Sequence, residues 1–422
     1  MIDLQNLELL TQDDEVALAS LGERQDDMVR QTIDWAKINT GSWNKLGLDK
    51  LSKKILSALS VLDADAELID LPTIKKVGND GQATHFKTAS VIHAQARPDA
   101  DVQLILTGHY DTVFPDGTFV DITDIGDGKL NGPGLADMKG GLVVMLEALK
   151  TFEQSPLKSK IGYRIVLTPD EEIGNFASST YLEAAAKDAH IGLTFEPAME
   201  TGAMSGARKG SAIFNIVFEG RSAHAGRNPH DGRSAIYAAA SFVTHVEQLE
   251  HKVEGVTFNV GKIDGGGANN IVPDLAIVRM GVRAPDAESA KWATEKLSEL
   301  FDKTLSRDGI KGQLSGGFYR PPKPRNKAQT ALFDATHRTG KALNLDLTFH
   351  DTGGVCEGNN VFAAGTPNID TLGVRGGRIH SHDEFVMTDS FVERASLTAL
   401  LLNRLADGRI NAAYIKSLMR ET

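Results

Sequence analysis

The sequence contains only one cysteine, Cys356, among its 422 residues. A single thiol excludes an intrachain disulfide and leaves a reducing compartment compatible with the chain. We interpret Cys356 as a small residue in a tight loop rather than as a nucleophile. No apolar run approaches the length of a membrane-spanning helix, and the first twenty residues lack a basic stretch followed by an apolar core. A cytoplasmic location is therefore the expectation.

Positive charge is also in deficit. Lys and Arg together number 45 against 56 for Asp and Glu, which gives a net charge of −11. An acidic surface argues against nucleic acid or an anionic membrane as the main partner, although a local site can still attract a small anionic substrate. With 41% hydrophobic and 24% charged residues the composition is that of a globular protein. The length exceeds one ordinary core and suggests two domains.

The first part of the chain has the texture of an α/β layer. Helical apolar spacing is present at 27–39 and 45–59, and extended segments are expected at 66–71 and 86–94. Strands then alternate with helices: we expect strands at 102–107, 161–168 and 191–195 and helices at 139–152 and 176–187. This alternation predicts a mainly parallel sheet flanked by helices.

The pattern of expected strands and helices changes after residue 209. We expect strands at 212–219, 256–262 and 275–283 and helices at 233–249 and 286–305, an order that resembles an antiparallel open-faced sandwich. A Pro-rich return at 316–326 follows, and the α/β texture then resumes. The predicted fold is a mixed, mainly parallel α/β catalytic domain (1–209 and 321–422) with an inserted α+β lid or dimerisation domain (210–320).

Five short motifs are expected at the ends of predicted strands, where ligands bind in open α/β sheets. In the first, His109 could ligate a metal while Asp111, two residues on, takes the other ring N–H. Taken alone, this pair also fits an ordinary loop histidine. In the second motif, Asp137 stands before an apolar helix and could either cap that helix or bridge two cations.

The other three motifs add carboxylates and a second imidazole. Glu171 and Glu172 end a strand, as a solvated acidic turn or as a general base beside a ligand. Glu196 follows another strand, and His380 stands two residues before a competing His382. Each motif is weak alone. Together they supply two histidines, one bridging aspartate and two glutamates, a suitable set for two divalent cations.

The order of these motifs, GHYDTV, NGPGLADMKGG, PDEEIG, FEP and HSHDE, resembles the zinc exopeptidase family that contains bacterial glutamate carboxypeptidase, aminoacylase, acetylornithine deacetylase and succinyl-diaminopimelate desuccinylase. In type the chain is nearest to bacterial glutamate carboxypeptidase. The resemblance spans nearly the whole chain. It implies that Asp137 bridges two zinc ions, that His109 and Glu196 complete one site, and that Glu172 and His380 complete the other. It further implies Glu171 as general base and Asp111 as the residue that orients His109.

The inserted segment carries further matches. The motif RSAHAG resembles a lid motif whose histidine, here His224, stabilises the oxyanion in the other subunit of a homodimer. Asn270 and Arg283 resemble substrate-binding positions, and a guanidinium suits a substrate carboxylate. Gly353 and Gly354 could offer backbone N–H groups to the same carboxylate. Without the resemblance, a surface histidine, a strand-end arginine and a plain turn would be the ordinary interpretations.

The sequence thus predicts a zinc-dependent metallopeptidase that cleaves an amide bond next to a free carboxylate, like a carboxypeptidase. The alternatives are an N-acyl-amino-acid deacylase, a dipeptidase or a metal-binding protein without catalysis. Cobalt or manganese could replace zinc in such a ligand set. The expected substrate is a small peptide or an N-acyl amino acid.

Overall fold

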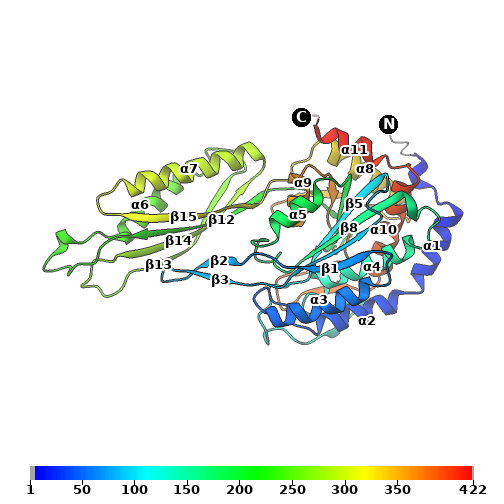
Figure 1. Cartoon of the computed structure of the whole chain (residues 1–422), viewed down its shortest axis with the longest axis horizontal. Coiled ribbons are helices and arrows are strands. Elements are labelled where there is room, and N and C mark those ends of the chain that lie inside the picture. The colour runs from blue at the N-terminus through cyan, green and yellow to red at the C-terminus, as the bar shows by residue number, and fades with distance from the viewer. Residues whose placement is uncertain (1–4, 421–422) are drawn as a thin grey trace.

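Six strands form the central sheet of the larger body, in the order β1-β4-β8-β5-β9-β17. The structure is a computed structural model that describes residues 5–420 (Figure 1). The strands are β1 (Asp65–Ile69), β4 (Val91–Ala96), β5 (Val102–His109), β8 (Ile161–Thr168), β9 (Ile191–Thr194) and β17 (Asn368–Ile369). The pairs β8–β5, β5–β9 and β9–β17 are parallel, and β1–β4 and β4–β8 are antiparallel. The sheet is therefore mixed and mainly parallel, as predicted.

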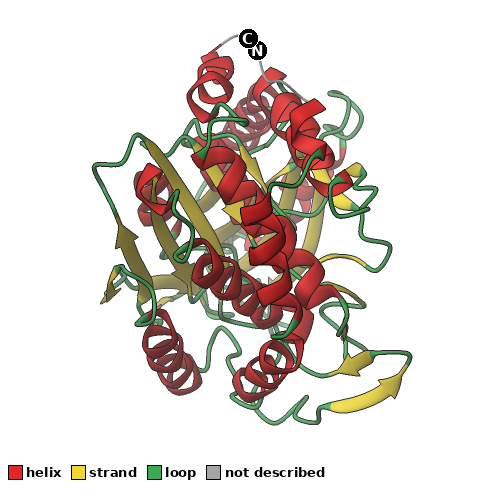
Figure 2. Cartoon of the chain, turned by 90° about the vertical axis from the view of Figure 1, so that its right-hand side faces the viewer, coloured by secondary structure: helices red, strands yellow, loops and turns green. Residues whose placement is uncertain are grey.

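Helices cover this sheet, as Figure 2 shows. They are α1 (Gln12–Gly22), α2 (Gln25–Ala36), α3 (Lys45–Leu59), α4 (Gly140–Phe152), α5 (Ser179–Ala186), α8 (Lys327–Lys341), α9 (Glu357–Ala363), α10 (Ser390–Ala406) and α11 (Ala412–Ser417). The apolar helix α4 is buried almost throughout and packs on α10. A side chain on Gly141 would lie 2.0 Å from the carbonyl oxygen of Phe195, so only glycine permits α4 to begin this close to β9.

The inserted segment forms its own antiparallel sheet, in the order β13-β14-β12-β15, with α6 (Ala235–Glu247) and α7 (Ala287–Leu305) on one face. The strands are β12 (Gly210–Glu219), β13 (Thr257–Gly265), β14 (Leu275–Ala284) and β15 (Lys311–Arg320). Successive side chains of a strand point to opposite faces. Phe214, Ile216 and Phe218 accordingly pack in a core with the two helices, while Ile213 and Asn215 line a cavity on the open face.

Two expectations about local structure were wrong. Residues 316–320 belong to the last strand, β15, rather than to a Pro-rich return, because they pair with β12 before Pro321 ends the ladder. The extended segment expected at 86–94 is two separate strands, since Phe86 ends β3 (Ala83–Phe86) and β4 begins at Val91.

The unexpected strand β3 forms a hairpin with β2 (Ile74–Val77), and Figure 1 shows this hairpin extending from the larger body toward the inserted sheet. Val77 packs against Val217 and Ile277 on the open face of that sheet. Arg279 Nη2 donates to the carbonyl oxygens of Val77 and Gly78 at 3.2 and 3.1 Å. The hairpin therefore joins the larger body to the inserted sheet by apolar and polar contacts.

Short strands complete the larger body. They are β6 (Thr123–Gly126), β7 (Lys129–Asn131), β10 (Ala198–Met199), β18 (Arg375–Gly377) and β19 (Phe385–Met387) in one sheet, and β11 (Met204–Arg208) with β16 (Phe349–Thr352) in another. Within residues 5–420, none of the helices combines the length and apolar character that crossing a membrane requires.

A buried ionic cluster fixes the base of the inserted sheet to the central sheet. Asp370 Oδ2 accepts from Lys323 Nζ at 2.8 Å and from Arg208 Nε at 2.7 Å. The Asp370 and Lys323 side chains are fully buried and that of Arg208 is 7% exposed. Two buried cations thus depend on one carboxylate.

We predict that Asp370→Asn lowers the free energy of unfolding by about 3–5 kcal/mol, because it leaves two buried cations without their counter-charge. The thermal and denaturant midpoints measure this loss. The control is Asp34→Asn, whose exposed pair with Lys37 spans 3.7 Å and should change stability by about 0.5 kcal/mol or less. Equal effects of the two variants would contradict the prediction.

Candidate metal centre and catalytic cleft

Three of the five predicted ligands lie at the carboxyl ends of adjacent parallel strands. His109 is the last residue of β5, Glu172 follows β8, and Glu196 follows β9. Because parallel strands end at the same edge of a sheet, residues far apart in sequence meet there. The fourth, Asp137, lies in a helical turn η2 (Leu135–Lys139) before α4, and His380 lies in the loop between β18 and β19.

The two carboxylate oxygens of Asp137 face the two histidines. Asp137 Oδ1 lies 3.1 Å from His109 Nε2, and Oδ2 lies 3.1 Å from His380 Nε2. The alternative role, capping of α4, is not observed, since that helix begins at Gly140 without a side-chain cap. One carboxylate between two imidazoles is the arrangement expected of a group that bridges two cations.

A glutamate completes each half of this cluster. Glu172 Oε2 lies 3.1 Å from His380 Nε2, and Glu196 Oε1 lies 3.8 Å from His109 Nε2. Glu196 Oε1 is buried and has no hydrogen-bond partner among the described residues. A buried, unpartnered carboxylate oxygen is costly unless a cation meets it. The donor set of imidazole nitrogens and carboxylate oxygens therefore fits two divalent cations.

The electrostatics agree with this fit. Burial raises the pKa of Glu172 well above its usual range. Hydrogen bonds to Asp137 and Glu172 raise the pKa of His380 to about 11. In the absence of cations the cluster thus retains protons that compensate its buried carboxylates, and divalent cations can take the place of those protons.

Asp111 connects the segments that carry the ligands. His109 Nδ1 lies 3.1 Å from the carbonyl oxygen and 3.3 Å from Oδ1 of Asp111. The Asp111 carboxylate also accepts from the backbone N–H groups of Glu171 and Glu172, each at 3.1 Å, and from Ser42 Oγ at 2.7 Å. Asp111 thus contacts His109, which it is expected to orient, and in addition the backbone of Glu171 and Glu172 and the side chain of Ser42.

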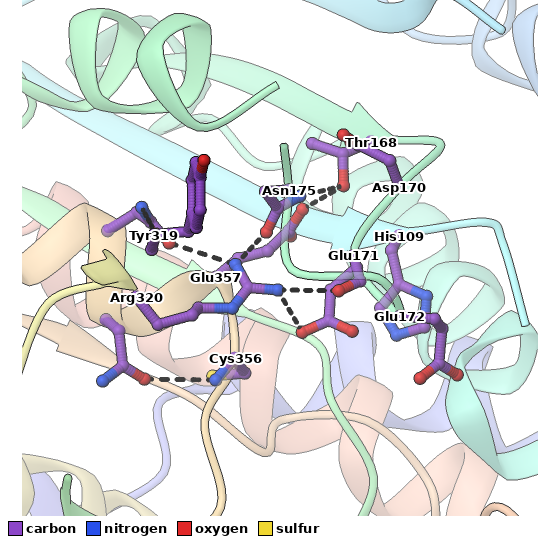
Figure 3. Close-up of polar contacts among 12 residues, drawn as sticks. His109, Thr168, Asp170, Glu171, Glu172, Asn175, Tyr319, Arg320, Cys356 and Glu357 are labelled. Carbon is purple, nitrogen blue, oxygen red and sulfur yellow. Dashed lines mark hydrogen bonds and ion pairs between the residues drawn. The ribbon is translucent and has the colours of Figure 1, made fainter. Parts of the chain in front are cut away.

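The spare carboxylate, Glu171, is held by an arginine of the inserted sheet, as Figure 3 shows. Arg320, the last residue of β15, donates from Nη2 to Glu171 Oε1 at 2.5 Å and to the Glu171 carbonyl at 3.0 Å. Its Nη1 donates to Asn175 and Asn360. Burial raises the pKa of Glu171 to about 7, although the Arg320 charge opposes this shift. Sequence reasoning missed Arg320 because no motif marks it.

The two candidate histidines of the HSHDE motif have different surroundings. His380 has a left-handed backbone, with φ of 63°, and faces the ligands, a strained conformation of the kind found at functional sites. The His382 ring instead packs against Phe119, with a centroid separation of 5.2 Å. Glu384 Oε1 accepts from the backbone N–H groups of Ala136 and Asp137 at 3.0 and 3.1 Å, so the same motif also fixes the Asp137 backbone.

A cavity of about 730 Å³ lies between the larger body and the inserted sheet. It is lined by Glu171, Glu172 and His380 of the larger body and by Arg283 of the inserted sheet. Arg283 donates to Ser211 and to the carbonyl oxygen of Val282. Within residues 5–420 no carboxylate pairs with the Arg283 guanidinium. Gly353 and Gly354 precede Val355, which lines the same cavity. A partly buried guanidinium without a counter-charge is therefore available to a ligand.

His224 and Asn270 do not line this cavity. They lie together on the inserted segment, where the N–H of Ala225 donates to the Asn270 carbonyl at 2.9 Å, and both side chains are exposed. The structure thus brings the predicted ligands, Glu171 and Arg283 together and leaves these two residues outside the cavity of their own chain.

Cys356 is the buried N-cap residue of α9, and its Sγ accepts from the Gly358 N–H at 3.3 Å. Burial raises the pKa of this thiol well above its usual range. These contacts agree with the small loop residue that the sequence suggested, because a nucleophile requires the thiolate.

Several known proteins share sequence and fold with this chain. The model of peptidase family M20/M25/M40 matches residues 105–404. Carboxypeptidase G2 of Pseudomonas sp. (strain RS-16) is 28% identical over 311 residues, covering 72% of this chain and 74% of the relative. Succinyl-diaminopimelate desuccinylase of Dechloromonas aromatica (strain RCB) is 24% identical, covering 84% and 98%. The Bacillus subtilis YXEP protein, described as a dinuclear metal binding peptidase, shares the fold with a TM-score of 0.59 and 14% identity, covering 90% of this chain and 99% of its own.

We predict that zinc binding to the metal-free protein releases protons and is tighter at pH 8 than at pH 6. The sign follows from the raised pKa of His380 and Glu172, since both groups must lose their protons to ligate a cation. Calorimetric titrations in buffers of different ionisation enthalpy count the protons. Affinity that is independent of pH would show that these groups do not ligate the metal.

Proposed function

The chain belongs to peptidase family M20/M25/M40 and is a metallopeptidase, and we propose that it uses two zinc ions to hydrolyse an amide bond next to a free carboxylate. The observation that carries the proposal is the convergence of two histidines and three carboxylates on one edge of the sheet, with Glu171 beside them. In this proposal Asp137 would contribute to holding both ions, His109 and Glu196 would hold one, and Glu172 and His380 would hold the other.

Glu171 is the proposed general base. Two bound divalent cations would polarise the amide carbonyl and lower the pKa of the attacking water. Glu171 takes a proton from that water and passes it to the nitrogen of the leaving amine. Its contact with Arg320 engages one carboxylate oxygen, so we assign Glu171 to proton transfer although it also lies within reach of His109 and Glu196.

The proposed substrate is a small peptide or an N-acyl amino acid with a free carboxylate at its C-terminal side. Arg283 supports this choice because its guanidinium lines the cavity and can bind a carboxylate with two parallel hydrogen bonds. Gly353 and Gly354 are proposed to add backbone N–H groups. A carboxypeptidase action follows, and deacylase or dipeptidase action differs only in the group on the far side of the amide.

We further propose a homodimer in which residues 210–320 act as a lid and dimerisation domain on the catalytic domain of 1–209 and 321–422. The position of His224 supports this, because it lies outside the cavity of its own chain. In a dimer, His224 and Asn270 of one chain would reach the cavity of the other. There His224 would donate a hydrogen bond to the amide oxygen as it becomes negatively charged.

We predict that Glu171→Gln lowers kcat by about 10²–10⁴-fold, because the amide cannot accept the proton. Zinc content, measured by atomic emission, should stay near two ions per chain. Glu295→Gln, an exposed change on the inserted segment, is the control and should alter neither. Loss of zinc together with activity would instead assign Glu171 as a ligand.

We predict that mixing His224→Ala and Glu171→Gln chains restores activity, since a hybrid dimer holds one cavity with both groups intact. Each variant alone should be impaired, His224→Ala by about 10²–10³-fold in kcat. Subunits are exchanged, and amine release is assayed against the mixing ratio. No recovery in verified hybrid dimers would contradict the role of His224 across subunits.

A further inference from the structure

A second cavity of about 440 Å³ adjoins the catalytic cavity, and Trp43, Glu172 and Ile173 line both. These three residues form the wall that the two cavities share. Glu172 is a proposed metal ligand, so the two cavities meet where the amide bond would be cleaved. A substrate whose amide lies at the metal centre can therefore place one half in each cavity.

The two cavities differ in charge. Five cationic residues line the catalytic cavity: Lys75, Lys76, Arg279, Arg283 and Arg320. Two carboxylates, Glu171 and Glu172, lie among them. In the part of the chain that the structure describes, the residues that line the second cavity include no Lys or Arg, and Asp116 is a carboxylate there in addition to the shared Glu172. A carboxylate is therefore favoured in the catalytic cavity and disfavoured in the second. This difference orients the substrate, with its free carboxylate toward Arg283.

The second cavity receives the other half of the substrate, and its remaining lining is largely uncharged. Val113, Pro115 and Ile173 contribute apolar surface. The indole of Trp43 adds a large ring that is still 44% exposed beside the metal ligands. An exposed large apolar side chain in a concave site marks a place where a ligand can bury apolar surface.

The backbone at Trp43 is fixed to the metal centre. The adjacent Ser42 donates from Oγ to Asp111 Oδ2 at 2.7 Å, and its N–H donates to the Thr112 carbonyl at 3.2 Å. Asp111 in turn binds the backbone of Glu172. The position of the indole is thus tied to that of the metal ligands.

The β2–β3 hairpin and the residue that ends it also contact the Trp43 ring. Phe86 packs against it edge to face, with ring centroids 5.1 Å apart, and Lys76 Nζ lies 4.5 Å from the ring centroid. The hairpin is itself docked on the inserted sheet through Val77 and Arg279. A ring fixed before the ligand arrives costs little entropy on binding.

We propose that Trp43 is a specificity-determining residue that receives an uncharged, apolar and preferably aromatic acyl group in the second cavity. The inference rests on the proposed function and deepens it by naming the acyl side of the substrate. An anionic acyl group such as succinyl is a poor substrate, because the described residues that line the second cavity add the carboxylate of Asp116 and no Lys or Arg to meet the anion.

The test uses three N-acyl derivatives of one amino acid: benzoyl, butyryl and succinyl. The wild-type enzyme should give the highest kcat/KM with benzoyl and the lowest with succinyl. Trp43→Ala should lower kcat/KM for benzoyl by about tenfold or more and for butyryl and succinyl by much less, because only the aromatic group loses its partner. Trp43→Phe should retain most of the benzoyl preference.

Leu46→Ala is the matched control, since Leu46 is a neighbouring apolar residue, 83% exposed, that lines neither cavity. It should leave all three values unchanged. Zinc content and the thermal midpoint of each variant exclude general damage. An equal loss for all three substrates in Trp43→Ala, or succinyl as the best wild-type substrate, would overturn the inference.

Binding separates this inference from the proposed function. The same three compounds are titrated calorimetrically into zinc-loaded Glu171→Gln enzyme, with and without Trp43→Ala. If the wild-type enzyme hydrolyses none of them, the proposed function is wrong. A benzoyl preference that depends on Trp43 would still support the acyl site, and equal affinity for benzoyl and succinyl would refute it.

Discussion

The site depends above all on the carboxylate of Asp111. This one buried group accepts from the backbone N–H groups of Glu171 and Glu172 and from Ser42, and it lies beside Nδ1 of His109. Hydrogen bonds to a carboxylate are stronger than those between neutral groups. Three segments distant in the sequence are thereby held in one arrangement: the loop of Trp43, the end of β5 and the end of β8. The proposed ligand Glu172, the proposed general base Glu171 and the backbone next to Trp43 share this support.

The inserted sheet contributes to the same cleft by strand alternation. On β14, Val278, Met280 and Val282 pack toward the helices, whereas Arg279 and Arg283 face the cavity. The last residue of β15, Arg320, holds Glu171. One face of this sheet thus forms its own core and the other supplies cations to the cleft. The hairpin that contacts Arg279 also packs on Trp43, so both cavities are shaped partly by the inserted layer.

The sequence was enough to predict the residues that now meet at the sheet edge, because each lies in a recognisable short motif. His109, Glu172 and Glu196 also stand at the ends of strands, whereas Asp137 and His380 lie in a helical turn and a loop. The mixed, mainly parallel sheet followed from the alternation of strands and helices. Ser42, Arg320 and Trp43 could not be found in this way. Arg320 lies 149 residues from Glu171, in a segment whose Gly and Pro residues indicated a turn. Only the pairing of β15 with β12 brings Arg320 to Glu171. The β2–β3 hairpin was missed because its few residues alternate weakly and derive their order from the sheet on which they dock.

The net charge of the chain and the charge of its cleft have opposite signs, and the physical reason is local. At physiological ionic strength, exposed charges more than about 8 Å apart are largely screened from each other, so the net charge of −11 has little influence inside the cleft. Cations that line a concave, partly buried surface are screened much less. Arg279 and Arg320 are already engaged by Asp264 and Glu171, which leaves Arg283 as the cleft arginine free of a carboxylate within residues 5–420. An anionic ligand would be attracted by those cations of the cleft that remain uncompensated, and the composition of the whole chain does not reveal them.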